Sequence, residues 1–378
     1  MYLSIGLIPI LGAVDKVGSQ FLCLGILNGV SLVYFLFDRK IESVFKNTFS
    51  NNFVVILLFL FWLWGLFSTI YAINTSEVII ESTRVLVYLQ AYISLYSLIK
   101  FSQLKLKNIF LWFSLILFIE TSWVLYELYL LADSGSQVFL KGRNILLRSF
   151  TGNINITAFA MVLKLPFLIF FLFYNKQINS IVKIILLGIV YFTIFLLGSR
   201  GANLTLGVVS LAIIIFGFYK YQRFKNLAFG LISAFTLSVI LNVFLFRDID
   251  GINYINRTTN LNNTSSQKRI KYYKYAFDKI LENPLRGIGM GNWKIYSIKS
   301  DLVEMDNYQI PFHVHNDFLE ITAELGLVGF CLYFGIYAFL LLGFIKLFRN
   351  KKIPEKEKLF GFVLILSIFV YLCDSFLN

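Results

Sequence analysis

Long apolar runs separated by short polar gaps make up most of this 378-residue chain. A helix that crosses a bilayer needs about 20 mostly apolar residues. Runs of this kind lie near residues 1–14, 18–37, 52–72, 78–99, 109–131, 153–174, 180–197, 202–218, 226–246, 321–345 and 359–376. The first run is short and the last ends without a polar tail, so a continuation of the chain at either end stays open. The pattern predicts an all-α polytopic membrane protein with about 11–12 transmembrane helices, of which residues 1–246 hold the first nine and residues 321–378 the last.

Residues 247–320 are the one long polar stretch between these runs. Its first part, residues 248–266, is rich in Asn and Thr and predicts an irregular loop. A helix follows and ends at Asn283-Pro284. Several apolar side chains recur at helical spacing and predict one apolar face, made of Ile270, Tyr273, Phe277, Ile280 and Leu281. We expect this amphipathic helix to lie against the membrane domain, with Arg269 on its buried flank.

Basic residues are distributed unequally between alternate gaps, and this sets the predicted orientation. One set of gaps holds 17 Lys and Arg residues, in clusters within residues 39–46, 100–107, 176–183, 220–225 and 346–358. The alternate short gaps hold five, which are Lys16, Lys141, Arg143, Arg148 and Arg200. Cytoplasmic loops carry the excess of Lys and Arg, so the first set is predicted to be cytoplasmic. Residues 247–320 are then a large loop on the opposite, extracytoplasmic side.

Composition agrees with a membrane protein and argues against other classes. Apolar residues make up 58% of the chain and charged residues 15%, against about 45–50% and about 25% in soluble domains. The formal charge of +13 would indicate nucleic-acid binding in a soluble protein. Here most basic residues lie where the positive-inside rule puts them, so the bilayer is the expected partner and nucleic acid is not. Cys23, Cys331 and Cys373 form no CxxC pair and imply no disulfide framework or zinc site.

Both histidines of the chain lie in one segment, residues 312–317, which reads Phe-His-Val-His-Asn-Asp just before a predicted span. Asn316 or Asp317 can cap the helix that follows. Histidine titrates near neutral pH and suits general acid–base work. Two alternatives stay open: an interfacial pair without a role, and a metal site whose ligands would be His313, His315, Asp317 and Glu320.

One arginine interrupts a stretch that is otherwise apolar from residue 181 to residue 218. Arg200 stands there between Gly198-Ser199 and Gly201. An arginine near lipid costs a few kcal/mol unless it is paired or solvated. A guanidinium binds phosphate bidentately and keeps its charge, so the segment is either an anion site or a plain turn between two helices.

Two further cations lie within apolar runs. Arg84 can pair with Glu81 or Glu77 on its own helix, which favours a structural role. Lys164 has no partner near it in sequence, so we expect it to face an internal polar cavity. The glycines in Gly287-x-Gly289-x-Gly291 lack the spacing of a dinucleotide fingerprint and predict a turn after a helix.

Together these pieces resemble the O-antigen ligase and polymerase family of bacterial envelope enzymes. The family pattern around its essential histidine is His, a small polar residue, nine residues, Gly, two residues and Gly. This chain has His315-Asn316, then residues 317–325, then Gly326-Leu327-Val328-Gly329. Ligases often follow the last glycine with two threonines. Phe330-Cys331 stands here instead, so the chain departs from lipopolysaccharide ligases proper at this point.

Three more stretches are similar to the family. Ser199-Arg200-Gly201 resembles its arginine turn, and residues 151–155, which read Thr-Gly-Asn-Ile-Asn, resemble the Gly-Asn-x-Asn start of a membrane helix. Arg269, with the helix that follows and residues 283–293, resembles the beginning of its large periplasmic loop. The resemblance covers about residues 15–378, and its specificity comes from the order of the motifs and their common side of the membrane.

The resemblance implies a large membrane glycosyltransferase-like fold in the bacterial inner (cytoplasmic) membrane, with an active site on the periplasmic side. The donor would be a glycan on a polyprenyl diphosphate, and the acceptor a hydroxyl of lipid A–core, another glycan or a protein. Transfer would invert the anomeric configuration without a metal or other cofactor. His315 would act as base, and Arg200 and Arg269 would stabilise the leaving diphosphate. Other candidates for substrate binding are Arg84, Arg148, Lys164, His313 and Asn316.

Two groups of alternatives remain from the sequence. Within the family, the chain could be an O-antigen polymerase or a protein O-oligosaccharyltransferase, which differ from a ligase in the acceptor. From another class, it could be a membrane transporter. Transporters often carry internal repeats with broken helices in matching halves. We find no such repeat in the chain, and the one long polar insert lies on one side of the pattern.

Overall fold

The computed structural model describes residues 5, 7, 8, 18–102, 106–133, 147, 149–175, 177–220, 225–245, 264–298 and 312–377. Within these residues the secondary structure is helical, without strands. Ten helices among the described residues are long and apolar enough to cross a membrane. Each coincides with one of the predicted runs, whereas the run at residues 1–14 falls almost wholly outside the described residues. The prediction of an all-α polytopic membrane protein is thus confirmed.

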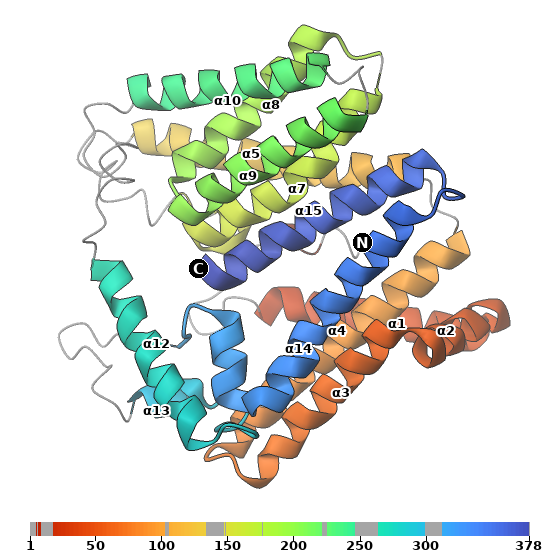
Figure 1. Cartoon of the computed structure of the whole chain (residues 1–378), viewed down its shortest axis with the longest axis vertical. Helices are drawn as coiled ribbons and strands as arrows, with labels where there is room; N and C mark the ends of the chain where they lie inside the picture. The colour runs from red at the N-terminus through yellow and green to blue at the C-terminus, as the bar shows by residue number, and fades with distance from the viewer. Residues whose placement is uncertain are drawn as a thin grey trace.

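The first helices form one group with a late helix of the chain (Figure 1). In this group α1 (Gly18–Phe37), α3 (Phe53–Phe67) and α4 (Thr75–Ser102) pack together, and α14 (Asp317–Arg349) lies along α3. A short 3-10 turn, η2 (Ser68–Ile70), follows α3. The gap between α1 and α3 is not the plain loop that its basic residues suggest. It forms α2 (Arg39–Asn51), capped by Asp38, with Ile41 fully buried on its inner face.

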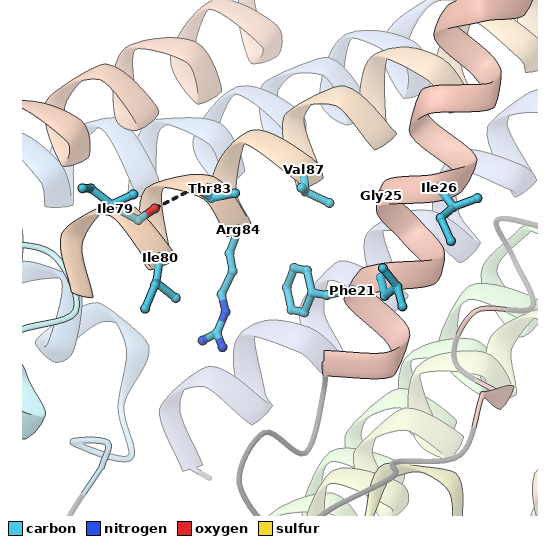
Figure 2. A pocket seen from close by; sticks show the side chains of 9 residues that line it. Phe21, Gly25, Ile26, Ile79, Ile80, Thr83, Arg84 and Val87 are labelled. Atoms are coloured by element: carbon cyan, nitrogen blue, oxygen red, sulfur yellow. Dashed lines mark hydrogen bonds between the residues drawn. The ribbon is translucent and has the colours of Figure 1, made fainter. Parts of the chain in front are cut away.

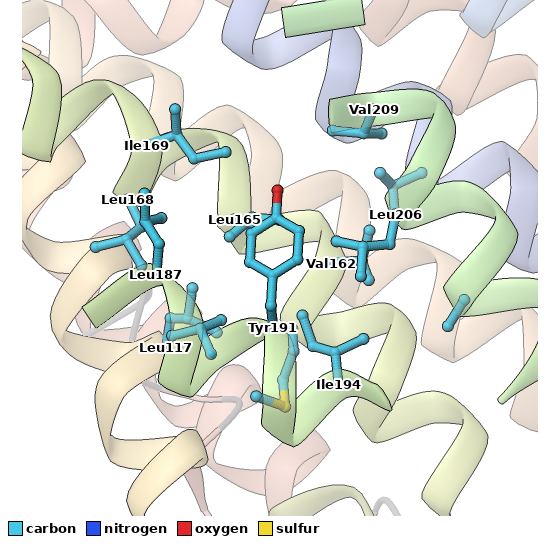
Figure 3. Close-up of a cluster of buried hydrophobic side chains, with 14 of the residues drawn as sticks. Leu117, Val162, Leu165, Leu168, Ile169, Leu187, Tyr191, Ile194, Leu206 and Val209 are labelled. Atoms are coloured by element: carbon cyan, nitrogen blue, oxygen red, sulfur yellow. The ribbon is translucent and has the colours of Figure 1, made fainter. Parts of the chain in front are cut away.

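A second group of helices lies beside the first (Figure 1), and it contains the largest apolar cluster among the described residues. Its helices are α5 (Leu106–Asp133), α7 (Ile154–Tyr174), α8 (Ser180–Leu197), α9 (Arg200–Lys220), α10 (Lys225–Leu245) and α15 (Glu355–Leu377). A 3-10 turn, η3 (Ser149–Thr151), precedes α7. Figure 3 shows Tyr191 at the centre, surrounded by Leu165, Ile194 and Leu206. The phenol oxygen of Tyr191 lies 2.6 Å from the hydroxyl of Ser210, so this buried polar group is satisfied.

A sharp break divides α14, and the sequence pattern does not predict it. Gly326 has φ +65° and ψ −169°, so residues 317–325, the short arm, fold back beside residues 327–349, the long arm. The Phe318 ring of the short arm lies 5.4 Å from the Tyr333 ring and 6.2 Å from the Tyr337 ring of the long arm. The predicted run at residues 321–345 therefore does coincide with a candidate span, but the break at Gly326 falls inside it. Glycine alone adopts this φ without strain, which allows the fold-back.

Two helices from the polar stretch complete the described structure. These are α12 (Thr264–Glu282), which packs against α14, and α13 (Trp293–Ile298). The predicted single apolar face of α12 is only partly correct. Tyr273 and Ile280 do pack on the buried cluster that includes Ala276. The remaining three side chains of that face are exposed, at 67%, 55% and 64% of their area: Ile270, Phe277 and Leu281.

Candidate functional site

His315 sits at the point where the chain turns into the short arm of α14. Its backbone has φ +63°, in the left-handed region that non-glycine residues rarely adopt. Two neighbouring side chains of α12 hold it there. The Tyr273 hydroxyl donates a hydrogen bond of 3.1 Å to the His315 carbonyl, and the Tyr272 ring stacks on the imidazole with centroids 6.2 Å apart. A strained backbone held by surrounding contacts is frequent at functional sites.

Arg269 lies on the same helix, one turn before these two tyrosines. It is half-buried, and its charge acts on the Tyr273 phenol. Burial raises the pKa of Tyr273, so the phenol keeps the proton that it donates to His315. Arg269 and His315, two predicted catalytic residues, are thus linked through Tyr273, whose phenol lies in the field of the guanidinium and donates to the His315 carbonyl.

Asn316 caps the short arm, as predicted. Its side-chain oxygen accepts a hydrogen bond of 3.1 Å from the Leu319 amide, and the residue is 9% exposed. Because the oxygen is used in the cap, only the side-chain NH₂ group could serve the predicted substrate-binding role. This cap orients the helix that begins directly after His315.

His313 is held differently from His315. Its Nδ1 lies 3.0 Å from Oε1 of Glu320, and the other oxygen of Glu320 accepts the Val314 amide at 2.8 Å. The hydrogen bond to Glu320 raises the pKa of His313 from 6.5 to about 9. His313 is therefore protonated at neutral pH, which makes it a cation rather than a base there.

Arg200 lies at the first position of α9, on the turn that joins α8 to α9. Gly198 ends α8 in the left-handed region, with φ +61°, and donates to the Phe195 carbonyl at 2.9 Å. The carbonyl of Ser199, a residue only 5% exposed, accepts the Asn203 amide at 2.9 Å. The segment is thus the turn that the sequence suggested. Its possible role as an anion site stays a prediction.

The three glycines after α12 bring a loop backbone against the break in α14. Gly287, Gly289 and Gly291 all have positive φ, at 70°, 103° and 70°. The amides of Ile288 and Gly289 donate to the carbonyls of residues 323 and 324, at 3.0 and 2.8 Å. The Leu327 amide donates back to the carbonyl of residue 284 at 2.8 Å. The predicted glycine turn is confirmed. Glycine is needed here because two backbones approach each other closely and the φ angles are positive.

Glu324 is a residue that sequence reasoning missed. It is 8% exposed, and its two carboxylate oxygens accept the amides of Gly291 and Trp293 at 2.8 and 2.9 Å. Because this buried carboxylate accepts hydrogen bonds from two backbone amides of the loop, it holds the loop against the short arm. The only sequence signal for this role was a glutamate two residues before Gly326. Its partners lie more than 30 residues earlier in the chain, so no local pattern connects them to it.

The same loop is also tied to the start of α4. The Asn292 side chain accepts the Asn74 amide at 2.9 Å and donates to the Asn74 carbonyl at 3.2 Å. The Lys294 ammonium lies 2.6 Å from a carboxylate oxygen of Glu77. In addition, the Met290 amide donates to the Ser68 hydroxyl at 3.0 Å. The loop therefore connects α14 with η2 and α4.

The remaining cations have different surroundings. Arg84 pairs with Glu81 at 2.7 Å, one of the two partners predicted from helical spacing. Lys164 forms hydrogen bonds of 2.8 and 2.9 Å with both carboxylate oxygens of Glu120 on α5. This partner lies 44 residues away, which is why no local pattern indicates it. Arg148 lies outside the described residues. Roles for these cations in substrate binding stay predictions.

Two of the four side chains considered as metal ligands contact each other, since Nδ1 of His313 lies 3.0 Å from Oε1 of Glu320. The charges of both act on the Asp317 carboxyl. In the part of the chain that the structure describes, no group of three or more His, Cys, Asp or Glu side chains is placed to bind a metal ion.

Known proteins are similar to parts of this chain. A family model described as O-antigen ligase matches residues 181–334. Two Rickettsia proteins named "Putative polysaccharide ligase" are also similar. The one from Rickettsia conorii is 35% identical over 75 residues, which are 18% of each chain, and the one from Rickettsia bellii is 33% identical over 78 residues, which are 19% of each chain. The resemblance to the O-antigen ligase family that the motifs indicate is therefore confirmed, over the stretch that carries Arg200, Arg269 and His315.

Proposed function

We propose that this chain is a membrane glycosyltransferase of the O-antigen ligase type. It moves a glycan from a polyprenyl-diphosphate carrier to an acceptor hydroxyl at the periplasmic face of the bacterial inner membrane. The family match and the names of the two relatives support this class of reaction. The observation that carries the proposal is that α12 holds Arg269 one turn before the two tyrosines that contact His315.

The proposed chemistry is a single displacement. The acceptor oxygen attacks the anomeric carbon while His315 takes its proton. The bond from that carbon to the diphosphate oxygen breaks, and its electron pair leaves with the lipid diphosphate. Arg200 and Arg269 stabilise the negative charge that grows there, because fixed guanidinium groups act strongly in a partly desolvated site. One displacement inverts the configuration, and the arginines supply the charge stabilisation that a metal ion would otherwise give.

His315 and His313 have different parts in this proposal. His313 is protonated near neutral pH through Glu320 and cannot take a further proton there, so the base role is given to His315. General base catalysis contributes about 10²–10⁴-fold. Purified His315→Ala should lose about that factor in transfer and keep donor binding, and His313→Ala should lose less. Turnover of the wild type should survive a strong chelator. Full activity in His315→Ala, or chelator-inactivated protein restored by zinc, would exclude the base assignment.

The two arginines can be tested by their geometry rather than their charge. Arg200→Lys and Arg269→Lys keep the charge and lose the bidentate fork, so transfer should fall strongly in both. Lys268→Arg, at the position next to Arg269, is a matched control that should keep activity. Unchanged transfer in Arg269→Lys would make this arginine an ordinary charge on the loop helix.

The proposed side of the membrane depends on residues 247–320 forming the periplasmic loop. Leu285 is 65% exposed and suits labelling, whereas Lys352 is exposed at the other end of α14. A cysteine at residue 285 should react with an impermeant thiol reagent in intact cells, and a cysteine at residue 352 should react only after lysis. The reverse pattern would place the site in the cytoplasm and exclude a periplasmic transferase.

The acceptor decides between a ligase, a polymerase and a protein O-oligosaccharyltransferase. Deleting the gene and analysing lipopolysaccharide, free glycan polymer and glycoproteins shows which molecule loses its glycan. The departure at Phe330-Cys331 from the ligase motif keeps the last two candidates in the test. A transporter would differ from all three, because protein purified in detergent would then form no new glycosidic bond.

A further inference from the structure

Openings in the first helix group border on α4 at different levels, and the cation in each is held differently. The groove between α1 and α4 (Figure 2), of about 620 Å³, contains Arg84, which pairs with Glu81 at 2.7 Å. A pocket of about 410 Å³ lies where the end of α2, the start of α3, the end of α4 and the long arm of α14 meet. Its lining residues are Asn47, Thr48, Asn52, Phe53, Tyr96, Lys100 and Phe339.

Lys100 is the charged residue of this pocket, and the lining contains no Asp or Glu. The residue is exposed, and its ammonium lies 5.8 Å from the centre of the Tyr96 ring, one turn earlier on α4. Among the described residues no carboxylate forms an ion pair with Lys100, in contrast to Arg84. An exposed cation–π contact is weak, so the ammonium keeps a positive charge that attracts an anion.

Two polar side chains of the lining are used within the fold, and a third is not buried. The Thr48 hydroxyl donates to the Val44 carbonyl at 2.8 Å. The Asn52 side chain accepts the amide of residue 54 at 3.1 Å and donates to the hydroxyl of residue 92 at 3.2 Å. These bonds fix the wall of the pocket. Asn47 is exposed, so its NH₂ group can donate to a ligand that also contacts Lys100.

The apolar part of the lining belongs to membrane helices. The rings of Phe53 and Phe339 lie 4.8 Å apart and are 48% and 38% exposed. Phe53 is the first residue of the α3 span, and Phe339 lies in the long arm of α14. The pocket therefore joins a polar rim at the end of a span to aromatic surface at the depth of the lipid chains.

The pocket also lies at the basic end of the first helix group. Figure 1 shows α2 at the end of α3 that is remote from α12 and α13. At this end α2 begins with Arg39 and Lys40, and α14 carries Lys346 and Arg349 in its last turn. These residues belong to the gaps predicted to be cytoplasmic. Basic pockets between membrane helices on that side are suited to the head groups of anionic lipids.

We propose that this pocket binds the phosphate of an anionic phospholipid, with the acyl chains along Phe53 and Phe339. An ammonium and a carboxamide NH₂ group are suitable donors to a phosphate. The cation of a zwitterionic head group would meet Lys100 and find no carboxylate in the lining. A soluble phosphate would leave the exposed rings uncovered, which favours a lipid. This site is separate from the proposed glycan transfer and does not depend on it.

The test uses the full chain in phosphatidylcholine nanodiscs that contain a small fraction of phosphatidylglycerol with a photoreactive acyl chain. After irradiation, the label should be found on residues 47–53 and on Phe339. Lys100→Gln should lower this labelling about fivefold, the contribution of one basic residue at a membrane surface. Lys100→Arg should label like the wild type, and so should Lys40→Gln, an exposed cation of α2 outside the lining. Equal labelling of Lys100→Gln and wild type would overturn the proposal.

Two further arms separate an anionic lipid from other sources of phosphate. Photoreactive phosphatidylcholine should label the same residues less than phosphatidylglycerol does. Equal labelling would make the pocket an ordinary lipid contact and reject the proposal. Unlabelled phosphatidylglycerol should compete, whereas inorganic phosphate should not. If inorganic phosphate competes equally well, the pocket is a site for a soluble anion and the proposal is wrong.

Melting in detergent gives a second measurement of the same site. A ligand that binds the folded protein alone raises the melting temperature. Added phosphatidylglycerol should therefore raise it more in wild type and Lys40→Gln than in Lys100→Gln. Asn47→Trp fills the pocket from an exposed position of α2 and should lose both the labelling and the shift, which keeps the test open should Lys100→Gln fail to fold. Equal shifts in all these proteins would reject the pocket as the binding site.

Discussion

The core around α7 and the loop region around the break in α14 are held together in different ways. Among the ten candidate spans, α7 has the largest share of buried residues, 67% of its most apolar 18-residue stretch. Apolar side chains from α5, α8 and α15 surround it. The short arm of α14 packs the Phe318 ring on the rings of the long arm, and backbone hydrogen bonds and glycine contacts tie it in addition to residues 284–293.

This difference in packing determines which substitutions each region tolerates. A core held by dispersion between many side chains can redistribute its contacts when one side chain changes shape. A loop held by backbone against backbone has no such freedom, because a single added carbon enters space that another main chain fills. The candidate site depends on the second region, since the short arm begins directly after His315.

The largest effect is expected for Gly326→Ala. A Cβ there would lie 2.2 Å from both the carbonyl carbon and oxygen of Leu285, and the positive φ adds strain. We expect a loss of more than about 4 kcal/mol, seen as little folded protein after detergent extraction. Gly343→Ala, on the same helix and with open space around it, should keep the wild-type melting temperature. A stable Gly326→Ala protein would remove the proposed contrast between the regions.

The next largest effect tests the ion pair of Lys164 and Glu120 inside the apolar core. Lys164 and Glu120 are 13% and 3% exposed, so Lys164→Met leaves a buried carboxylate without its partner. This should cost about 3–5 kcal/mol, and Glu120→Met added to it should restore most of the loss. Arg84→Met is the matched control. Its pair with Glu81 is 32% and 27% exposed and should matter by about 0–1 kcal/mol. Thermal unfolding of the wild type and the three variants measures these differences.

Glu324→Gln measures how much the loop depends on one carboxylate. Glutamine keeps one oxygen and places an NH₂ group against the second backbone amide, so Gly291 or Trp293 loses its acceptor. An unsatisfied buried donor costs about 1–3 kcal/mol. The exposed Glu357→Gln should lie within about 0.5 kcal/mol of wild type in the same melting assay. Equal stability of both variants would show that the loop is held by its other contacts alone.

A volume-conserving change in the core should have a smaller effect. Leu165 is fully buried in α7, and Leu165→Met keeps nearly the same volume on a more flexible chain. We expect a cost below about 1.5 kcal/mol and unchanged transfer activity. A loss larger than that of Glu324→Gln would show that the core is as intolerant as the loop.

The smallest effect concerns the pH response of His313. Because its pKa is raised to about 9, the protonated form stabilises the fold. This contribution is complete below the ordinary value of 6.5 and is lost as the pH rises through about 9. The side chain is 73% exposed, so solvent screening keeps the effect on stability small. The chain has two histidines, so labelled imidazole NMR can follow both. His313 should titrate near 9 in the wild type and near 6.5 in Glu320→Gln, and equal values would exclude the ion pair.

Several features of the site could be predicted from single segments. The cap at Asn316, the turn at Gly198 and the pairing of Arg84 with Glu81 all depend on residues within a few positions of one another. The prediction of one apolar face on α12 was only partly correct. Helical spacing alone shows that its apolar arc is wide, but it cannot show which half packs on α14 and which half is exposed.

The sequence by itself determined the number and position of the membrane helices in the described part of the chain. It also determined the motifs that connect the chain to the O-antigen ligase family. Run length and spacing are local properties, so they survive without knowledge of the fold. Only the tertiary structure decided that α14 folds back at Gly326, that Glu324 closes the loop, and that Lys164 meets Glu120. These features join residues far apart in the chain or depend on one backbone angle, and neither leaves a periodic signal in the sequence.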